Sequence, residues 1–563
     1  MTREIRERSQ IDSFGVSFGP APKQAASASQ KQLEKWNILV CSDLGYISQK
    51  PCAVGIAEWN EFVAAQGAVV SGTVDAASCG EAKPLFVEIP VKSMKDLTSE
   101  SIAASVAPLS GLSKTLFGLE QLLDGKAGRN DVLALIRKAG LSAAEEARVA
   151  SLLDVRPNSL PKKPEARPRN SSIDNILSMV DGTSSAGDGD APQGGHTATD
   201  ALFKSVAGSE ESPLDKAAID AYVRECRARL QRMTDAVVSQ PFFASRKASW
   251  NCLMTLAKVI GRKKEVCLHV FSGPQAHAED SLTSVLSSCM EASVAADMIV
   301  WDYDVTFTNA SVDAMAQAAS AADQYKCVMI APLSMSDPLM RDLACRESVM
   351  HFFDEVRFLP FKKLRTGSSA RCLCLCGPTL SPLEGYASSA GRCPWFVATR
   401  WVEMLLVDNN PFGACDVRPP LDGVFPQDAV FSCTVAPSVA LEARAMGLTL
   451  FEQSLRQASL DKAVTLIAGE AAMASYASVL FNLVVNRAVR LSGIKTLAQG
   501  AGVGRVEVTS VLEKLLRTEL SAYGVISADQ QVAIAAVNDG TINVVVDSDA
   551  TVAGYKVNFT FSF

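Results

Sequence analysis

The sequence predicts a mixed α/β (α+β) protein in which two folded domains are joined by a disordered linker. Residues 156–212 hold five prolines among runs of Ser, Gly, Asp and Lys, and their apolar residues are too sparse to offset the entropy of ordering. On both sides of this linker, apolar runs that suit buried strands alternate with apolar stripes at helical spacing. We therefore divide the 563 residues into an N-terminal arm (1–35), a first domain (36–155), the linker, a second domain (213–525) and a C-terminal strand region (526–563).

Charge and cysteine spacing exclude several classes of protein. The net charge of −7 argues against a nucleic-acid partner, because such proteins carry a basic face. The 15 cysteines include no Cys-x-x-Cys and no Cys/His pair at zinc spacing, so we expect no metal; Cys372, Cys374 and Cys376 suit buried thiols of a strand. Met1 is followed by charged residues, and the longest uncharged apolar stretch, 471–486, is too short for a membrane span. We expect a soluble cytoplasmic protein.

The first domain begins with a strand. Residues 36–41 (WNILVC) form an apolar run that suits a buried strand, and a turn follows at 42–45. Residues 56–63 carry apolar side chains at helical spacing, and 86–91 alternate as a strand in which a proline, lacking a backbone donor, favours an edge. Leucines at three- and four-residue intervals over 109–123 predict a long helix or a helix pair with one buried stripe.

The second domain begins with two helices. Ser212 is the predicted N-cap of an amphipathic helix over 213–237, which stops before a proline. A second amphipathic helix over 240–260 then leads into a predicted strand at 266–271.

The C-terminal region predicts a hairpin and a last strand. Two apolar runs, 532–537 and 541–546, flank Asn538-Asp539-Gly540, and Asp-Gly between such runs is a strong hairpin signal. In the last nine residues, apolar side chains alternate with polar ones. A strand of this kind invites another chain wherever its edge is unpaired.

A short apolar strand also lies near the N-terminus, isolated from the first domain by flexible residues. Both terminal strands pair within their own molecule in one interpretation. In the other they are exchanged with neighbouring copies, which is a form of β-augmentation. The candidate inter-subunit strand residues are Phe14, Val16, Phe18, Tyr555, Val557, Phe559, Phe561 and Phe563.

Four short segments follow one another in the first domain: 42–44 (Ser-Asp-Leu), 59–62 (Trp-Asn-Glu-Phe), 96–100 (Asp-Leu-Thr-Ser-Glu) and 106–109 (Val-Ala-Pro-Leu). Together they resemble the turn, aromatic and helix-start motifs of the small subunit of the type VI secretion contractile sheath, in the same order. The glycine that precedes the turn aspartate in that family is Ser42 here.

The second domain resembles the large subunit of the same sheath over most of 213–525. The matching segments are Gln240–Phe243 with Ser249–Leu253 and Leu256, Asp302–Pro332, Arg346–Ser348 with Phe358–Pro360, Trp395–Leu406 and Glu442–Leu450. The sequence departs from the family where a Gly-Gly-x-Pro-Phe-Gly loop is replaced by 281–298.

The resemblance implies a fusion of the small and large sheath subunits, each contributing a sheath-type α/β domain. It implies a bacterial structural protein whose copies stack in rings around an inner tube, joined by exchanged strands, and contract to drive the tube outward. The partners it implies are other copies of this chain, the inner tube protein and baseplate components. It implies no enzymatic activity and no cofactor.

The linker contains a short amphipathic segment at 172–180. Ile173, Ile176, Leu177 and Val180 form one apolar stripe of a two-turn helix, which is too short to be stable alone. It resembles the N-terminal helix of the sheath large subunit, which a hexameric AAA+ unfoldase grips after contraction. A helix that docks on its own domain is an equally good interpretation.

The sequence offers no convincing catalytic set. The four histidines are dispersed, and the glycines of 500–504 lack the preceding strand and the Lys-Ser/Thr of a phosphate loop. Asp302 and Asp304 are expected on one face of a strand, and the resemblance makes them structural. Arg400 and Arg487 lie inside apolar helical segments, where we expect buried ion pairs or packing.

Two alternatives stay open. One is a sheath-like protein that no longer polymerises and acts as a baseplate or assembly adaptor, which the missing glycine loop permits. The other is an α/β enzyme of a kind that the sequence does not reveal. Tube formation distinguishes the sheath subunit from the adaptor, and a nucleotide-binding or hydrolase assay identifies the enzyme.

Overall fold

The computed structural model places the chain in part. The described residues are 35–141, 143–153, 215–261, 263, 265–291, 294–325, 327–333, 342–343, 346, 348–349, 351–377, 380–381, 393–408, 430–431, 435–450, 452–454, 457–459, 465–466, 487–488, 510, 513–518, 521, 532–536, 542–552 and 555–562. The predicted N-terminal arm before residue 35, the predicted linker and the glycine run 500–504 lie outside them.

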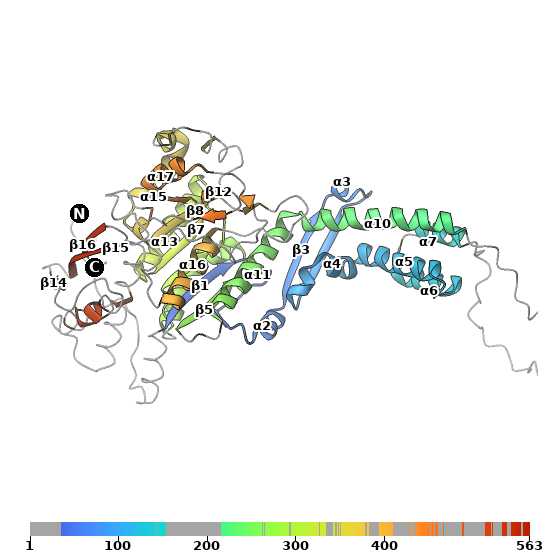
Figure 1. The fold of residues 1–563 in the computed structure, drawn as a ribbon, viewed down its shortest axis with the longest axis horizontal. Coiled ribbons are helices and arrows are strands. Elements are labelled where there is room, and N and C mark those ends of the chain that lie inside the picture. The colour runs from blue at the N-terminus through green and yellow to red at the C-terminus, as the bar shows by residue number, and fades with distance from the viewer. Residues whose placement is uncertain are drawn as a thin grey trace, which may run out of the picture. The chain divides into compact units, whose positions relative to one another are not determined.

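The largest sheet among the described residues has seven strands in the order β11-β8-β7-β6-β1-β5-β2. Its strands β8, β7, β1 and β5 are labelled in Figure 1. Six strands are parallel, and only β2 runs antiparallel, at one edge. The strands are β1 (Trp36–Ser42), β2 (Cys52–Val54), β5 (Val266–Ser272), β6 (Met298–Trp301), β7 (Val328–Pro332), β8 (Leu373–Gly377) and β11 (Leu448–Leu450). The predicted mixed α/β class is confirmed.

The strand β1 lies between β5 and β6, so the sheet takes strands from both sides of the predicted linker. Every residue of β1 is buried, as an apolar run at the centre of a parallel sheet should be. The predicted boundary between a first domain (36–155) and a second domain (213–525) therefore does not separate the strands of this sheet. Local patterns identify a strand, but its partners are set by contacts more than 200 residues away, which no window of sequence contains.

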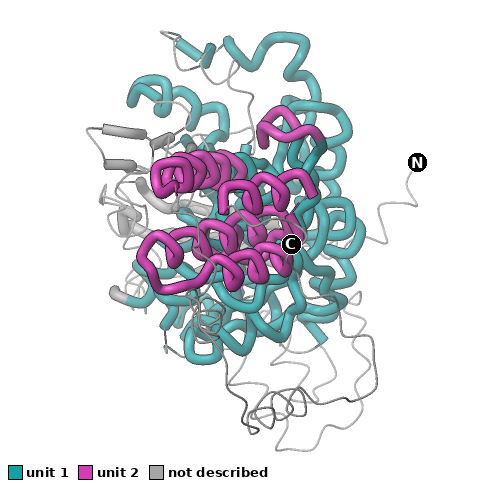
Figure 2. Tube along the Cα trace, turned by 90° about the vertical axis from the view of Figure 1, so that its right-hand side faces the viewer, with its two compact units in different colours: residues 1–75, 83–98, 236–563 teal, residues 76–82, 99–235 magenta. Residues whose placement is uncertain are grey.

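The chain instead divides into two compact units, shown in teal and magenta in Figure 2. Unit 1 comprises residues 1–75, 83–98 and 236–563, and unit 2 comprises 76–82 and 99–235.

Helices cover both faces of the large sheet in unit 1. On one face α11 (Pro241–Ile260) packs against β5, and α16 (Cys393–Asp408) packs against β6, β7 and β8. On the other face α12 (Gln275–Glu291) and α13 (Asn309–Gln324) bury an apolar cluster against β1 and β7, to which Leu39 and Cys41 contribute. Successive β1 residues point to opposite faces, which is why this strand needs an uninterrupted apolar run.

Shorter elements complete unit 1. They are α15 (Leu359–Thr366), α17 (Pro437–Ala445), the 3₁₀ turns η2 (Met94–Leu97), η3 (Phe352–Asp354), η4 (Val356–Phe358) and η5 (Ser368–Cys372), and the two-stranded pairs β9 (Leu380–Ser381) with β10 (Val430–Phe431) and β12 (Glu452–Ser454) with β13 (Gln457–Ser459). The predicted burial of Cys372, Cys374 and Cys376 is confirmed.

A separate two-stranded ribbon follows the helix α2 (Trp59–Ala65). It pairs β3 (Ala68–Val74) with β4 (Leu85–Val91), and β4 has no other partner among the described strands. The predicted edge position of Pro90 is thus confirmed. Gly72 of β3 lets α11 approach, because a Cβ there would lie 2.5 Å from the Phe242 ring.

Unit 2 is helical. Its elements are α3 (Ala76–Cys79), α4 (Ser99–Ser105), α5 (Ala107–Leu123), α6 (Arg129–Ala139), α7 (Ala143–Leu152) and most of α10 (Lys216–Val238). The predicted leucine stripe is confirmed, since α5 buries Leu109, Leu112, Leu116, Leu119 and Leu122. The predicted helix from 213 is described only from Lys216, where Asp215 accepts a hydrogen bond from the Ala218 amide at 3.0 Å and so caps the helix.

Among the described residues, no single helix has both the length and the apolar composition of a membrane span; only α4 and α5 taken together, with a 98° bend between them, pass the same test.

Candidate functional site

A buried polar cluster joins β1, β6 and α11 at the carboxyl ends of the strands. Ser42 ends β1, and its hydroxyl donates to Asp302 Oδ2 at 2.7 Å. The Ser249 hydroxyl of α11 donates to the same oxygen. All three side chains are at most 3% exposed. Both donors reach Oδ2, and they offset part of the cost of burying this carboxylate.

Two further contacts, a hydrogen bond and an ion pair, join the turn after β1 to α11. Trp250 Nε1 donates to the Leu44 carbonyl at 3.1 Å, and the Arg246 guanidinium pairs with Asp43 at 3.0 Å. Gly45 makes the turn with a φ of 85°, and its carbonyl accepts from the Val69 amide at 2.9 Å. The predicted turn at 42–45 is confirmed, and its role is to bind α11.

Aromatic side chains extend this cluster. Trp59 and Phe62 of α2 meet the Trp250 ring edge to face, with centroids 6.2 and 6.3 Å apart. The segments 42–44, 59–62, 249–253 and 302–303 therefore converge in space, although they come from both sides of the predicted linker. We call this set the β1 junction.

The β1 junction occupies the topological switch point of the sheet. After β1 the chain continues to β2 and β5 on one side, and after β6 it continues to β7 on the other. Open α/β sheets bind ligands at such a point. Here Ser42, Leu44 and Asp302 fill this position, and all three are buried. The geometry therefore suits a structural contact between segments of the chain rather than a ligand site.

The carboxylates of Asp302 and Asp304 differ in their burial. The expectation that Asp302 and Asp304 share a strand face is wrong, because β6 ends at Trp301 and both residues follow the strand. Asp302 is buried in the junction, and Asp304 is exposed.

A buried ion pair lies at the opposite, amino end of the sheet. Arg487 Nη1 lies 3.4 Å from Asp297 Oδ2 and donates to the Lys35 carbonyl at 2.7 Å, and its guanidinium stacks 4.3 Å from the Trp36 ring centroid. The Arg487 and Asp297 side chains are 6% and 2% exposed. The expected buried pairing of Arg487 is confirmed, and Arg400 pairs with Glu403 at 3.0 Å. The Arg487 contact holds the start of β1 in place.

No group of three or more metal-ligating side chains occurs within the described residues. The thiols of Cys41 and Cys393 are buried, and burial raises the pKa of each well above the ordinary range. Thiols of this kind are poor nucleophiles and poor ligands.

His269 lies inside the sheet, on β5 opposite Ala53 of β2, and burial lowers its pKa from 6.5 to about 4. The unfolded chain takes up a proton below about pH 6.5, whereas folded His269 stays neutral until about pH 4, so stability should fall across this window. The loss should approach about 3 kcal/mol by pH 4. Denaturant unfolding at pH 7, 5.5 and 4 should show this extra loss in the wild type and its absence in His269→Gln; parallel pH profiles would refute it.

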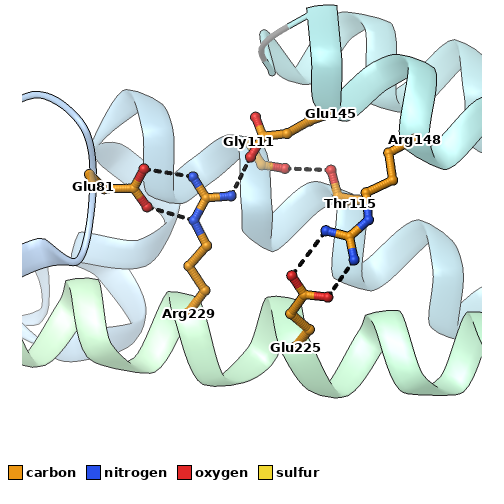
Figure 3. Close-up of polar contacts among 7 residues, drawn as sticks. All are labelled: Glu81, Gly111, Thr115, Glu145, Arg148, Glu225 and Arg229. Carbon is orange, nitrogen blue, oxygen red and sulfur yellow. Dashed lines mark hydrogen bonds and ion pairs between the residues drawn. The ribbon is translucent and has the colours of Figure 1, made fainter.

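Unit 2 carries a set of arginine–glutamate pairs along α10 (Figure 3). Arg229 donates to both oxygens of Glu81, at 2.6 and 2.8 Å, and also to Glu145. Arg148 and Glu225 form two bonds, at 3.0 and 2.7 Å, and the contact lowers the pKa of the Glu225 carboxyl. These pairs join α10 to α7 and to the segment after α3.

The predicted C-terminal hairpin is confirmed, and the last strand belongs to the same sheet. β14 (Val532–Ala536) pairs antiparallel with β15 (Ile542–Val552), which pairs in turn with β16 (Tyr555–Ser562). Only two residues separate Val552 from Tyr555, which is the length of a tight hairpin loop. Sequence reasoning missed this second hairpin, because Ala553-Gly554 is not one of the dipeptides typical of a two-residue hairpin loop.

The candidate strand residues Tyr555, Val557, Phe559 and Phe561 all lie in β16. The register places Phe559 opposite Val546 and Phe561 opposite Val544. β15 is the central strand, so β14 and β16 each have an outer edge with no partner among the described strands. The other candidates, Phe14, Val16, Phe18 and Phe563 and the linker residues Ile173, Ile176, Leu177 and Val180, lie outside the described residues.

Comparison of the chain with protein-family models gives no match, and no curated protein matches it.

Proposed function

We propose that this chain is the structural subunit of a contractile type VI secretion sheath in the bacterial cytoplasm. Its copies polymerise around an inner tube and shorten to propel it. The energy is held in packing between copies, so the subunit needs no catalytic site and no cofactor. Its partners in this role are further copies of itself, the inner tube protein and the baseplate. An AAA+ unfoldase is a further partner if the segment 172–180 serves as its recognition helix rather than docking on its own domain.

The observation that carries this proposal is the C-terminal sheet. A three-stranded sheet with two outer edges that have no partner among the described residues offers backbone donors and acceptors to a strand from another copy. Tyr555 to Phe561 already lie in strand conformation at one of these edges, so a visiting strand would meet a preformed template.

A long stretch of chain joins the predicted N-terminal strand to the sheet. Its last residue, Phe18, is 17 positions before Lys35, and at roughly 3.3–3.6 Å per residue the intervening chain spans up to about 55–60 Å. Lys35 itself is held at the amino end of β1 by Arg487. We propose that residues 1–34 reach a neighbouring copy from this fixed point.

The β1 junction supports the fusion of two subunits in one chain. The segments that resemble the small subunit (42–44 and 59–62) pack directly on those that resemble the large subunit (249–253 and 302–303). Two proteins that complete one sheet must be present in equal amounts, and one polypeptide fixes that ratio and raises their effective concentration toward the millimolar range.

Electron microscopy of the purified full-length chain tests the function. Negative staining should show hollow tubes of constant diameter. Chains that stay monomeric under all conditions would contradict the proposal, and discrete oligomers that do not elongate would support the adaptor instead. Specific nucleotide binding or hydrolase activity without polymerisation would support the enzyme.

A further inference from the structure

The helices of unit 2 are joined in two different ways. α5 and α6 pack closely: a Cβ at Gly111 of α5 would lie 2.8 Å from the Ala139 carbonyl oxygen of α6, so the backbones nearly touch. The polar contacts of α10 with the rest of unit 2 are made instead by the ends of long arginine and glutamate side chains (Figure 3). We call the contact surface between α10 and α5, α7 and residues 76–82 the α10 seam.

The order of the paired residues gives the relative direction of α7 and α10 in the seam. Glu145 of α7 meets Arg229 of α10, and Arg148, one turn later in α7, meets Glu225, one turn earlier in α10. The two helices are therefore antiparallel. The chain leaves α7 at Leu153 and enters α10 at Asp215, so these two residues end opposite sides of the seam at the same end of unit 2.

The outer part of the seam is accessible to salt. The side chains of Arg148 and Glu225 are 55% and 54% exposed, and those of Arg227 and Glu120 are 64% and 43% exposed. Ion pairs of this exposure contribute little, and mobile ions screen them. Arg229 is the strongest point, because it is 32% exposed and holds two glutamates through its fork of donors.

An apolar stripe lies beneath these pairs. Ile219, Tyr222, Val223 and Cys226 of α10 are at most 5% exposed. The Arg148 guanidinium covers the Tyr222 ring at 4.8 Å, and burial raises the pKa of the Cys226 thiol. Cys226 thus reports on whether the seam is closed.

The length of α10 and its internal ion pairs favour its helical form even without its partners. The helix has 23 residues, and pairs four residues apart, such as Arg224 with Asp220, support it from within. Isolated helices become stable in water only above about 12–15 residues, a length that α10 exceeds and α7, with ten, does not reach.

We propose that unit 2 opens along the α10 seam as a separate, salt-sensitive step, in which α10 parts from α7 and α5 while the α5–α6 pair stays closed. The opening uncovers the apolar stripe of α10. Because Leu153 and Asp215 end opposite sides of the seam, a force that pulls these two residues apart acts across it. This inference concerns the chain itself and does not rest on the sheath function.

Thiol labelling of the full-length chain tests the opening. A pulse of N-ethylmaleimide is followed by peptide mass spectrometry, comparing Cys226 with Cys376, a buried thiol of β8 in unit 1. Cys226 should label faster than Cys376 in the wild type, and faster still in 1 M NaCl. Arg148→Gln should raise the Cys226 rate about three- to fivefold and Arg229→Gln roughly tenfold or more, with Cys376 unchanged. Arg229→Lys, which keeps the charge but loses the fork, should fall between.

The matched control is Arg224→Gln, which removes an exposed arginine of α10 whose pair lies within the helix. It should leave the Cys226 rate unchanged. Amide exchange of α5 decides whether a variant opened the seam or unfolded unit 2, since α5 stays protected in the first case only. The proposal is overturned if Cys226 and Cys376 label together in every protein, if salt has no effect, or if α5 loses protection whenever Cys226 is exposed.

Discussion

Residues 213–563, produced without the residues before them, are expected not to fold. Removing β1 opens a gap between β5 and β6 and leaves the facing hydrogen-bond ladders of both strands unpaired. It also removes five side chains that are at most 5% exposed: Trp36, Ile38, Leu39, Val40 and Cys41. At about 1.5–3 kcal/mol each, their burial contributes roughly 8–15 kcal/mol, which is as much as the net stability of a typical domain.

Producing residues 1–155 in the same cells should restore folding and give a soluble one-to-one complex. The control is the same fragment carrying Val40→Asp, which places a charge in the centre of the sheet and should not rescue. Circular dichroism and denaturant titration of the purified fragments provide the measurement. A cooperative unfolding transition of 213–563 alone would show that the sheet does not depend on β1.

Deleting 555–563 is expected to abolish tubes while the sheet of unit 1 stays folded. The deletion removes β16 and with it the outer edge proposed to receive a neighbouring strand. Because β16 pairs only with β15 among the described strands, its loss should not reach β1 or its neighbours. Negative-stain microscopy scores the tubes, and amide exchange of β1 and β5 scores the fold. Tubes that survive the deletion would show that polymerisation does not depend on strand exchange at β16.

A matched pair of variants separates the two faces of β16. Tyr555, Val557, Phe559 and Phe561 alternate with Lys556, Asn558, Thr560 and Ser562, so the two sets occupy opposite faces. Replacing the first set by threonine should abolish tubes. Replacing Lys556, Asn558 and Ser562 of the second set by threonine should preserve them, because threonine keeps strand propensity in both cases.

The sequence revealed elements more readily than their partners. β1, β4, β5 and the helices α5, α10 and α11 follow from apolar runs, alternation and helical spacing, and these signals lie within a few residues of each other. β3 was missed because Val69 and Val70 are adjacent and its apolar residues do not alternate strictly. β6 was expected a few residues too late, at Asp302 and Asp304, because its own run of four buried residues is short. β2 was also missed, because its three residues are too few to form a recognisable pattern.

For the candidate site too, the sequence identified the segments but not the contacts between them. The segments that form the β1 junction were each identified on their own, but their meeting depends on contacts such as that between Ser42 and Asp302, 260 residues apart. The buried role of Arg487 could be expected from a charge in an apolar helix, whereas its position over Trp36 could not. Pairing of the last strand within its own molecule was one of two interpretations of the sequence, and β16 does pair with β15. The other edge of β16 has no partner among the described strands, so a strand from a neighbouring copy can still pair there.

Cross-linking of isotopically mixed chains tests the central claim most directly. Chains labelled with ¹⁴N and ¹⁵N are mixed before assembly and treated with an amine cross-linker, and peptides joining Lys23 or Lys31 of the arm to Lys556 of β16 are sorted by mass. If neighbouring copies exchange their terminal strands, about half of these pairs should join a light chain to a heavy one. Pairs that are all light with light or heavy with heavy would show that each chain's ends meet only within that chain.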